Sequence, residues 1–330
     1  MIICANLWTK NSVEKKAANL HKQAVITKCR VKYQCGAKPC LFKKSRGFPC
    51  QNTMRNEICD NPIKNYICDN LWIKMKNYYF VFCKGDIMLE KLPDGKYTIP
   101  CQELPPTDIK QWTNVMNVTP LGDIPVKTYR IDAPITDNPR FEMCGLRPSY
   151  YKLSPELYQK AGKCEELLYW DQNTKFCGVC GGQMKMHTDI SKRCEECGKE
   201  VWPSLATAII VLVHRGDEVL LVHARNFRGN FFGLVAGFVE TGESLEEAVH
   251  REVMEETGLT ITNLRYFGSQ PWPYPSGLMV GFHADYVSGE IKLQKEELAA
   301  GQWFTKDNLP EIPEKLSIAR RIIDDWLSNA

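Results

Sequence analysis

The segment 237–259 constrains the fold and function of this chain most. In it, the end of an apolar run is followed by a short loop and then by an acidic helix. The run 231–239 is broken by glycines, which is typical of a buried strand whose backbone another group approaches closely. Ser244, with Glu247 three residues later, predicts a capping box and therefore the start of a helix. Gly258 suits the left-handed position that ends such a helix.

Three carboxylates lie on one face of this predicted helix, because Glu252, Glu255 and Glu256 stand at i, i+3 and i+4. Like charges at this spacing repel each other and weaken a bare helix. Bound Mg²⁺ or Mn²⁺ relieves the repulsion, and such ions hold phosphate-bearing substrates. The alternative is a solvated acidic face. The glycine-containing loop and the apolar strand in front of the helix favour the metal site.

The spacing resembles the box of the Nudix hydrolases, a family that cleaves nucleoside diphosphates linked to another moiety. Its fixed positions are filled by Gly237, Glu243, Arg251, Glu252, Val253, Glu255, Glu256, Gly258 and Leu259. The resemblance implies that Glu252 and Glu256 ligate the metals and that Glu255 is a ligand or a base. It also implies that the carbonyl of Ala236 reaches a metal and that Arg251 and Glu243 brace the loop.

Four cysteines form two CxxC pairs, Cys177 with Cys180 and Cys194 with Cys197, separated by thirteen residues. This spacing predicts one tetrahedral zinc ion held by four thiolates. We expect the zinc to be structural, because four cysteine ligands leave no open position for water. The alternative, a redox CxxC, is expected singly beside a βαβ unit.

Residues 269–279 read Ser-Gln-Pro-Trp-Pro-Tyr-Pro-Ser-Gly-Leu-Met. The alternating prolines predict a stiff, extended loop, and Trp272 and Tyr274 offer flat faces on which a ring of the substrate stacks. The alternative is a buried proline-rich connection between strands.

The four cysteines, the box and this loop, in this order along the chain, resemble the NADH pyrophosphatase branch of the Nudix family over about residues 75–326. The resemblance implies a further metal ligand, Glu297. It implies substrate contacts at Trp202, Gln270, Pro271, Trp272, Pro273, Tyr274, Pro275, Ser276, Gly277 and Ala319. The chain departs from the branch at three of these positions: Tyr274 replaces phenylalanine, Gly277 replaces serine, and Trp202 replaces tyrosine.

The predicted fold class is α+β, a Nudix α/β/α sandwich with a zinc ribbon and an N-terminal, mostly-β domain. We expect an N-terminal domain at 75–170, the ribbon at 171–204 and the catalytic domain at 205–330. Strands are predicted at 78–83 and 87–89, a helix at 154–169, a hairpin at 206–213 and 219–222, and a closing helix at 317–326. Arg140 and Arg147 are candidate phosphate partners, although surface salt bridges are the favoured interpretation.

Residues 1–74 differ from the rest of the chain. They hold 14 Lys+Arg against 4 Asp+Glu, a formal +10, whereas the whole chain carries only +3. Seven of the 15 cysteines also fall here, without a CxxC. One interpretation is a basic arm that binds RNA or another polyanion. We favour an extension outside the fold, with Met75 as the real start.

We therefore expect a metal-dependent hydrolase that cleaves NADH or NAD⁺ to a nicotinamide mononucleotide and AMP. The branch is dimeric and includes enzymes that remove NAD caps from RNA, so a homodimer and NAD-capped RNA are further expectations. The alternative is a catalytically silent, nucleotide-sensing or RNA-binding protein with a Nudix fold. With no apolar run of about 18 residues and no signal peptide, we expect no membrane span and a cytoplasmic location, which the free cysteines also favour.

Overall fold

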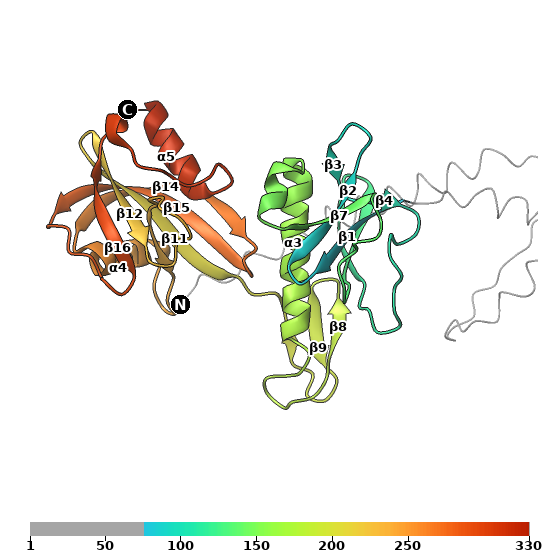
Figure 1. The fold of residues 1–330 in the computed structure, drawn as a ribbon. Helices are drawn as coiled ribbons and strands as arrows, with labels where there is room; N and C mark the ends of the chain where they lie inside the picture. The colour runs from blue at the N-terminus through green and yellow to red at the C-terminus, as the bar shows by residue number, and fades with distance from the viewer. Residues whose placement is uncertain (1–75, 330) are drawn as a thin grey trace, which may run out of the picture. The chain divides into compact units, whose positions relative to one another are not determined.

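The computed structural model describes residues 76–329, which all belong to one compact unit by their contacts. The predictions for the extension 1–74 lie outside the described residues. Figure 1 shows the arrangement of the helices and strands. No helix in the described part of the chain is long and apolar enough to cross a membrane.

The N-terminal sheet has seven strands, and both strands predicted here are confirmed. They are β1 (Asn77–Cys83), β2 (Asp86–Lys91), β3 (Tyr97–Thr98), β4 (Cys101–Gln102), β5 (Met116–Leu121), β6 (Ile124–Arg130) and β7 (Phe141–Gly145). The order is β3-β2-β1-β6-β5, with β4 paired to β1 and β7 paired to β2. Only β1 and β6 run parallel among these pairs.

A short 3₁₀ helix, η1 (Pro148–Tyr151), leads into the long helix α3 (Pro155–Asn173). The predicted start of α3 is confirmed, because the Ser154 hydroxyl accepts a hydrogen bond from the Leu157 N–H. Buried α3 residues such as Ala161 and Leu168 share one hydrophobic cluster with Phe80 of β1. The helix therefore packs on the N-terminal sheet.

The four cysteines belong to a small three-stranded sheet of β8 (Met184–Thr188), β9 (Ser191–Cys194) and β10 (Glu200–Val201). All neighbouring strands of this sheet run antiparallel. The sheet contributes few apolar side chains to its own core, which holds Cys177, Met184 and Cys194. A unit with so small a core needs a further stabilising element, such as a metal.

The third sheet has six strands in the order β14-β15-β11-β12-β16, with β13 paired to β11. Their bounds are β11 (Ala206–Arg215), β12 (Glu218–Ala224), β13 (Val235–Phe238), β14 (Thr260–Trp272), β15 (Gly277–Ser288) and β16 (Leu298–Phe304). The predicted hairpin is confirmed, since β11 and β12 pair antiparallel with His214 opposite Val219. A short 3₁₀ helix, η2 (Lys306–Asn308), follows β16.

Two helices cover the two faces of this sheet, α4 (Leu245–Thr257) and α5 (Ile318–Asn329). Alternate residues of β11 face opposite sides of the sheet. Ile209 and Val211 pack in one cluster with α4, and Ile210 and Leu212 pack in another with α5. The predicted α/β/α sandwich is therefore confirmed.

The proline-rich segment is less of a loop than the sequence predicts. Residues up to Trp272 belong to β14 and residues from Gly277 onward belong to β15, and Trp272 pairs with Gly277. Only residues 273–276 lie outside the strands. The segment is thus the tip of a long hairpin, which we call the hairpin tip (Trp272–Gly277). The prolines end the ladder because they have no N–H to donate.

Candidate functional site

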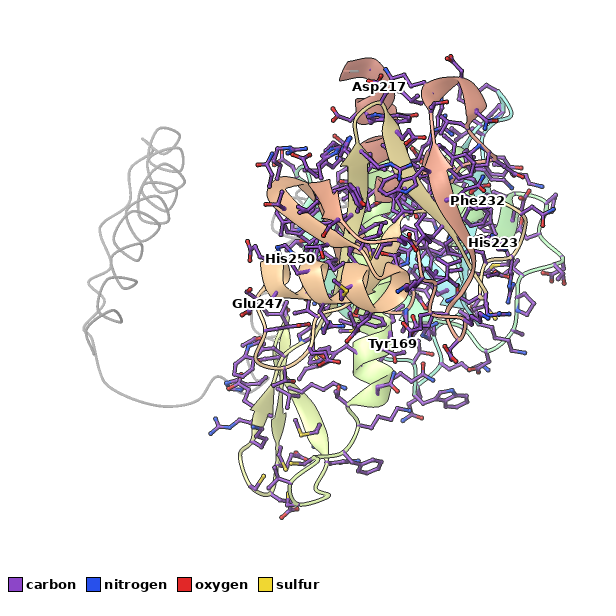
Figure 2. All side chains as sticks on the ribbon, turned by 90° about the vertical axis from the view of Figure 1, so that its left-hand side faces the viewer. Tyr169, Asp217, His223, Phe232, Glu247 and His250 are labelled. Carbon is purple, nitrogen blue, oxygen red and sulfur yellow. The ribbon has the colours of Figure 1, made fainter. Side chains whose placement is uncertain are left out.

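Helix α4 begins and ends as its sequence predicts. The Ser244 hydroxyl accepts from the Glu247 N–H, and the Glu247 carboxylate accepts from the Ser244 N–H at 2.7 Å, which completes the capping box. Gly258 has φ 71°, in the left-handed region. Figure 2 shows this helix on the sheet, with Glu247 and His250 labelled along it.

Arg251 ties α4 to the loop in front of it. Its guanidinium donates to both oxygens of Glu243, at 2.6 and 3.0 Å, and to the carbonyl of Phe238 at 2.9 Å. A second nitrogen donates to Glu252 at 2.8 Å. These bonds hold the pKa of the Glu243 carboxyl low, at about 2. The loop and the glutamate face of α4 are therefore fixed relative to each other.

The glutamates of α4 differ in exposure. Glu252 and Glu256 are buried, whereas Glu255 is exposed. Burial first, and then repulsion by Glu252, Glu297 and Glu255, raises the pKa of Glu256 to about 8. The pKa of Glu252 is raised as well, again mainly by burial. Buried carboxylates that repel one another are the donor set that a hard divalent cation stabilises.

Glu297 reaches this cluster because the chain before it is fastened to the end of α4. The Lys292 N–H donates to the carbonyl of Thr257, and the Gln294 N–H donates to the carbonyl of Glu256 at 2.9 Å. Glu297 is exposed and close enough to raise the pKa of both buried glutamates. Glu297, which follows Glu256 by 41 positions in the sequence, thus lies near the glutamate face of α4.

Gly237 on β13 leaves room for the carboxylate of Glu252. A Cβ at Gly237 would lie 1.9 Å from the carboxyl carbon and 2.0 Å from one oxygen of Glu252. A side chain at position 237 would force this carboxylate to move, so the glycine of the box forms a cradle for the carboxylate. Ala236, whose carbonyl is the implied metal contact, precedes Gly237 on the same strand. The cradle and the repelling carboxylates fit a divalent cation.

A cavity of about 700 Å³ opens beside this strand. Of the residues predicted to contact metal or substrate, Ala236, Trp272 and Ala319 line it. Its other walls include Phe227, the residues Gly233 and Leu234 just before β13, and residues 311–314 and 317–318. The cavity is open and mostly apolar, which suits the flat ring of a ligand rather than its charged phosphate groups.

Arg147 also lines the cavity, and its guanidinium lies 5.4 Å from the ring centroid of Trp272. The prediction of a surface salt bridge is therefore wrong for Arg147. It is right for Arg140, which pairs with Glu90 at 2.8 Å. No local signal separates the two arginines, because only the packing of the N-terminal domain carries Arg147 to the cavity.

The other predicted substrate residues lie outside the cavity lining. Gln270 donates to the carbonyl of Leu316 at 2.8 Å, and Ser276 donates to the carbonyl of Ser204 at 3.0 Å. Trp202 is 56% exposed. The rest belong to the strand end and hairpin tip: Pro271, Pro273, Tyr274, Pro275 and Gly277.

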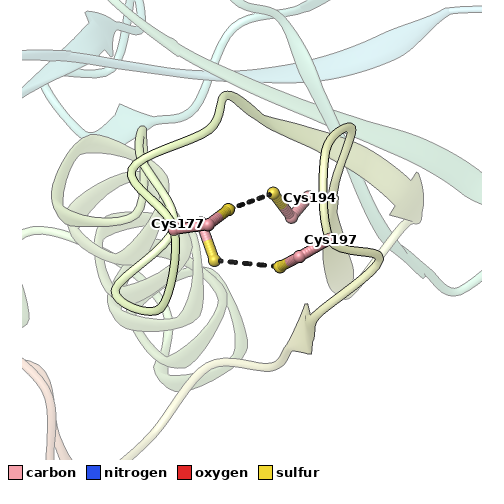
Figure 3. Close-up of side chains that lie close together, drawn as sticks. Cys177, Cys194 and Cys197 are labelled. Carbon is pink, nitrogen blue, oxygen red and sulfur yellow. Dashed lines mark hydrogen bonds between the residues drawn. The ribbon is translucent and has the colours of Figure 1, made fainter.

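The four cysteine sulfurs all lie within 4.8 Å of one another, and no other such cluster occurs within residues 76–329. The Cys177 and Cys197 sulfurs lie 3.6 Å apart, and the Cys180 and Cys194 sulfurs lie 3.5 Å apart. Figure 3 shows the cluster, with Cys177, Cys194 and Cys197 labelled. A tetrahedron with Zn–S bonds of about 2.3 Å has sulfurs about 3.8 Å apart. Backbone N–H groups of the knuckle lower the pKa of Cys177 to about 6, which favours the thiolate. The cluster therefore fits a structural zinc ion.

Replacing Cys194 with serine is expected to remove about one zinc ion per chain and to lower the melting temperature, because the ribbon has almost no core of its own. Zinc content by atomic absorption and a thermal melt measure both effects. Cys101→Ser, at a half-buried cysteine outside the cluster, is the control. Full zinc content in the Cys194 variant would contradict a four-cysteine site.

Two family models match this chain. The NUDIX domain model matches residues 203–327, and the model for the NADH pyrophosphatase-like rudimentary NUDIX domain matches residues 76–170. The NAD-capped RNA hydrolase NudC of Pseudomonas aeruginosa is 42% identical over 205 residues, covering 62% of this chain and 73% of the relative. NudC of Pectobacterium atrosepticum is 45% identical over 170 residues, covering 51% of this chain and 65% of the relative. A solved NUDIX hydrolase of Nitrosomonas europaea has a TM-score of 0.41 at 20% identity, covering 47% of this chain and 92% of that one.

A sandwich whose acidic helix faces a glycine cradle defines a hydrolase that works with divalent metal. The chain belongs to the Nudix hydrolase family, with a rudimentary Nudix domain ahead of the catalytic one. The sequence predicted a mostly-β domain at 75–170 without indicating that it is itself Nudix-like.

Proposed function

We propose that this protein hydrolyses the diphosphate of NADH or NAD⁺ to a nicotinamide mononucleotide and AMP. The observation that carries the proposal is the position of the box beside the cavity: Ala236, next to the cradle of Glu252, also lines the cavity. One ligand can therefore reach both places, with its ring against Trp272 and its diphosphate at the glutamates. The similarity to NAD-capped RNA hydrolases supports the same substrate class.

In this proposal Glu252, Glu256 and Glu297, with the carbonyl of Ala236, hold Mg²⁺ or Mn²⁺. Bound there, the cations neutralise the diphosphate and acidify a water molecule. Arg251 holds the loop against α4, so that the carboxylates keep their positions through the reaction. Glu255, exposed at the edge of the cluster, is a further ligand or takes the proton of the attacking water.

In this proposal, different walls of the cavity contact different parts of the substrate. Trp272 stacks on a ring, and the small side chain of Ala319 leaves room opposite it. Arg147 stands where its guanidinium meets phosphate oxygens at the edge of the ring. Gln270, Ser276 and the prolines act on the substrate by holding the hairpin tip in place.

We also propose that the protein works as a homodimer in the cytoplasm. Trp202 is exposed and does not line the cavity described for its own chain, which supports a substrate contact made from a second copy. The four-thiolate zinc site suits a reducing compartment. The proposed division is an N-terminal domain at 75–170, a ribbon at 171–204 and a catalytic domain at 205–330.

Removal of NAD caps from RNA is a second candidate function, favoured by the names of the relatives. A silent, nucleotide-sensing protein is disfavoured, because a sensor has no need of buried glutamates that repel one another.

The test is a product assay on NADH, NAD⁺ and NAD-capped RNA with Mg²⁺ or Mn²⁺. We expect AMP and the mononucleotide from at least NADH, and none of either with EDTA. Cleavage of capped RNA alone would favour the second function. Cleavage of none of the three with either metal present would contradict the proposal.

A further inference from the structure

One face of α3 lies along the hairpin tip. Tyr158, Gly162 and Glu166 stand at i, i+4 and i+8, and therefore share that face, which we call the α3 face. The Tyr158 hydroxyl lies 2.7 Å from the Tyr274 hydroxyl. A Cβ at Gly162 would lie 3.0 Å from the ring of Pro273, so the helix backbone touches the hairpin tip.

The third contact is made by Glu166. The Gly277 N–H donates a hydrogen bond to the Glu166 carboxyl. Gly277 itself is tightly enclosed, since a Cβ there would lie 3.2 Å from the carbonyl oxygen of Trp272. The other oxygen, Oε1, is buried and has no hydrogen-bond partner among the described residues. An unsatisfied buried carboxyl oxygen destabilises the packed state, so stability alone does not explain Glu166.

The hairpin tip connects the α3 face to the cavity. The Tyr274 ring meets the Trp272 ring edge-on, with centroids 5.1 Å apart, and Trp272 lines the cavity. Trp272 and Tyr274 also pack against the hydrophobic cluster that contains the buried residues of α3. A shift of the hairpin tip on α3 therefore moves the aromatic wall of the cavity.

The hydroxyl pair lies in a partly buried place. Tyr274 brings a hydroxyl there, and Tyr158 satisfies its hydrogen-bonding capacity. Burial raises the pKa of both phenols, so both stay neutral and one donates to the other. Losing either hydroxyl leaves the other without its partner.

We propose that the α3 face positions the substrate wall: Tyr158 and Glu166 hold the hairpin tip, and through it they hold Trp272. The proposal rests on the proposed function in one respect, namely that the cavity binds the ring of the substrate. Tyr158 and Glu166 are positioning residues, which act through Trp272.

The hold of Glu166 on the hairpin tip depends on pH, because its carboxyl is packed in a place where Oε1 is buried without a hydrogen-bond partner among the described residues. Burial raises its pKa to about 7, against the opposing effects of the Gly277 N–H and of Lys163 on the same helix. The packed state thus favours the protonated carboxyl. Its contribution is present at low pH and is lost as the pH rises through about 7. Affinity for the ring is expected to fall over the same range.

The kinetic test compares wild type with Glu166→Gln, which cannot ionise, using NADH at pH 6.0 and 8.5. We expect KM to rise about three- to tenfold more in wild type than in the variant, with a similar kcat profile in both. Glu156→Gln, at an exposed position of the same helix, is the matched control and should follow wild type. Parallel KM profiles in wild type and Glu166→Gln would overturn the proposal.

A readout independent of activity is tryptophan fluorescence. We expect a titration with a midpoint near pH 7 in wild type, absent in both Glu166→Gln and Trp272→Phe. Titration without NADH cleavage would sink the proposed function but keep the positioning role. Cleavage without titration would sink the positioning role alone.

The hydroxyl pair is tested with Tyr158→Phe, Tyr274→Phe and the double variant. Each single change is expected to raise the KM for NADH about three- to fivefold, and the double change by less than the product of the two. Multiplicative effects would show that the two hydroxyls do not act together.

Discussion

Replacing Glu256 with glutamine is expected to lower kcat for NADH about a thousandfold, or about 4 kcal/mol of barrier, while the protein stays folded. Glu256 is 4% exposed and lies among three other carboxylates, so a neutral amide there removes a charge that a divalent cation needs. The measurement is a steady-state assay at saturating Mn²⁺. Glu246→Gln, at an exposed position on the same helix, is the matched control and should retain activity.

The same change is expected to stabilise the metal-free protein. Burial and repulsion raise the pKa of Glu256 to about 8, so the folded state binds a proton more readily than the unfolded chain. The destabilisation from its ionisation therefore grows as the pH rises from about 4.5 to 8. Melting curves in EDTA should show a gain in the variant that increases over this range. Unchanged activity together with unchanged stability would remove Glu256 from the site.

Gly237→Ala is expected to lower NADH cleavage about a hundredfold, because the new methyl group displaces the carboxylate of Glu252. A Cβ 1.9 Å from the carboxyl carbon forces Glu252 or strand β13 to move by an ångström or more. Displacements of about 1 Å in a catalytic arrangement cost rate factors of this order. A higher Mn²⁺ concentration for half-maximal activity should accompany the loss.

Gly268→Ala is the matched control. It lies in β14 of the same sheet, and its nearest neighbour to a new Cβ is an Arg321 nitrogen at 3.8 Å, an ordinary contact. This variant should fold and cleave NADH like wild type. Equal activity of Gly237→Ala and Gly268→Ala would show that the cradle has no part in catalysis.

Local features of the site could be predicted because they depend on neighbours in the chain. The capping box at Ser244, the glutamate face of α4 and the glycine that ends the helix follow from helical spacing alone. The cysteine pairs follow from the geometry of a tetrahedral ion, and the structure brings all four sulfurs together. Each of these is a short-range pattern with one favoured arrangement.

Other residues could not be placed without the tertiary structure. Arg140 and Arg147 stand at opposite ends of the short strand β7, yet one pairs with Glu90 and the other meets Trp272. Glu166 carries no signal in the sequence, because it is one of three glutamates of α3 and a helical glutamate is ordinarily solvated. Its contact with Gly277 exists only because α3 and the hairpin tip, more than a hundred residues apart, pack together.

The sequence by itself determined the chemistry of this protein: a carboxylate face for divalent metal and a thiolate cluster for zinc, both written in spacings of a few residues. The tertiary structure alone decided the shape of the cavity beside them. Arg147 comes to it from another domain, and the α3 face reaches it only through the hairpin tip. Such long-range packing depends on the fit of whole surfaces rather than on any local period.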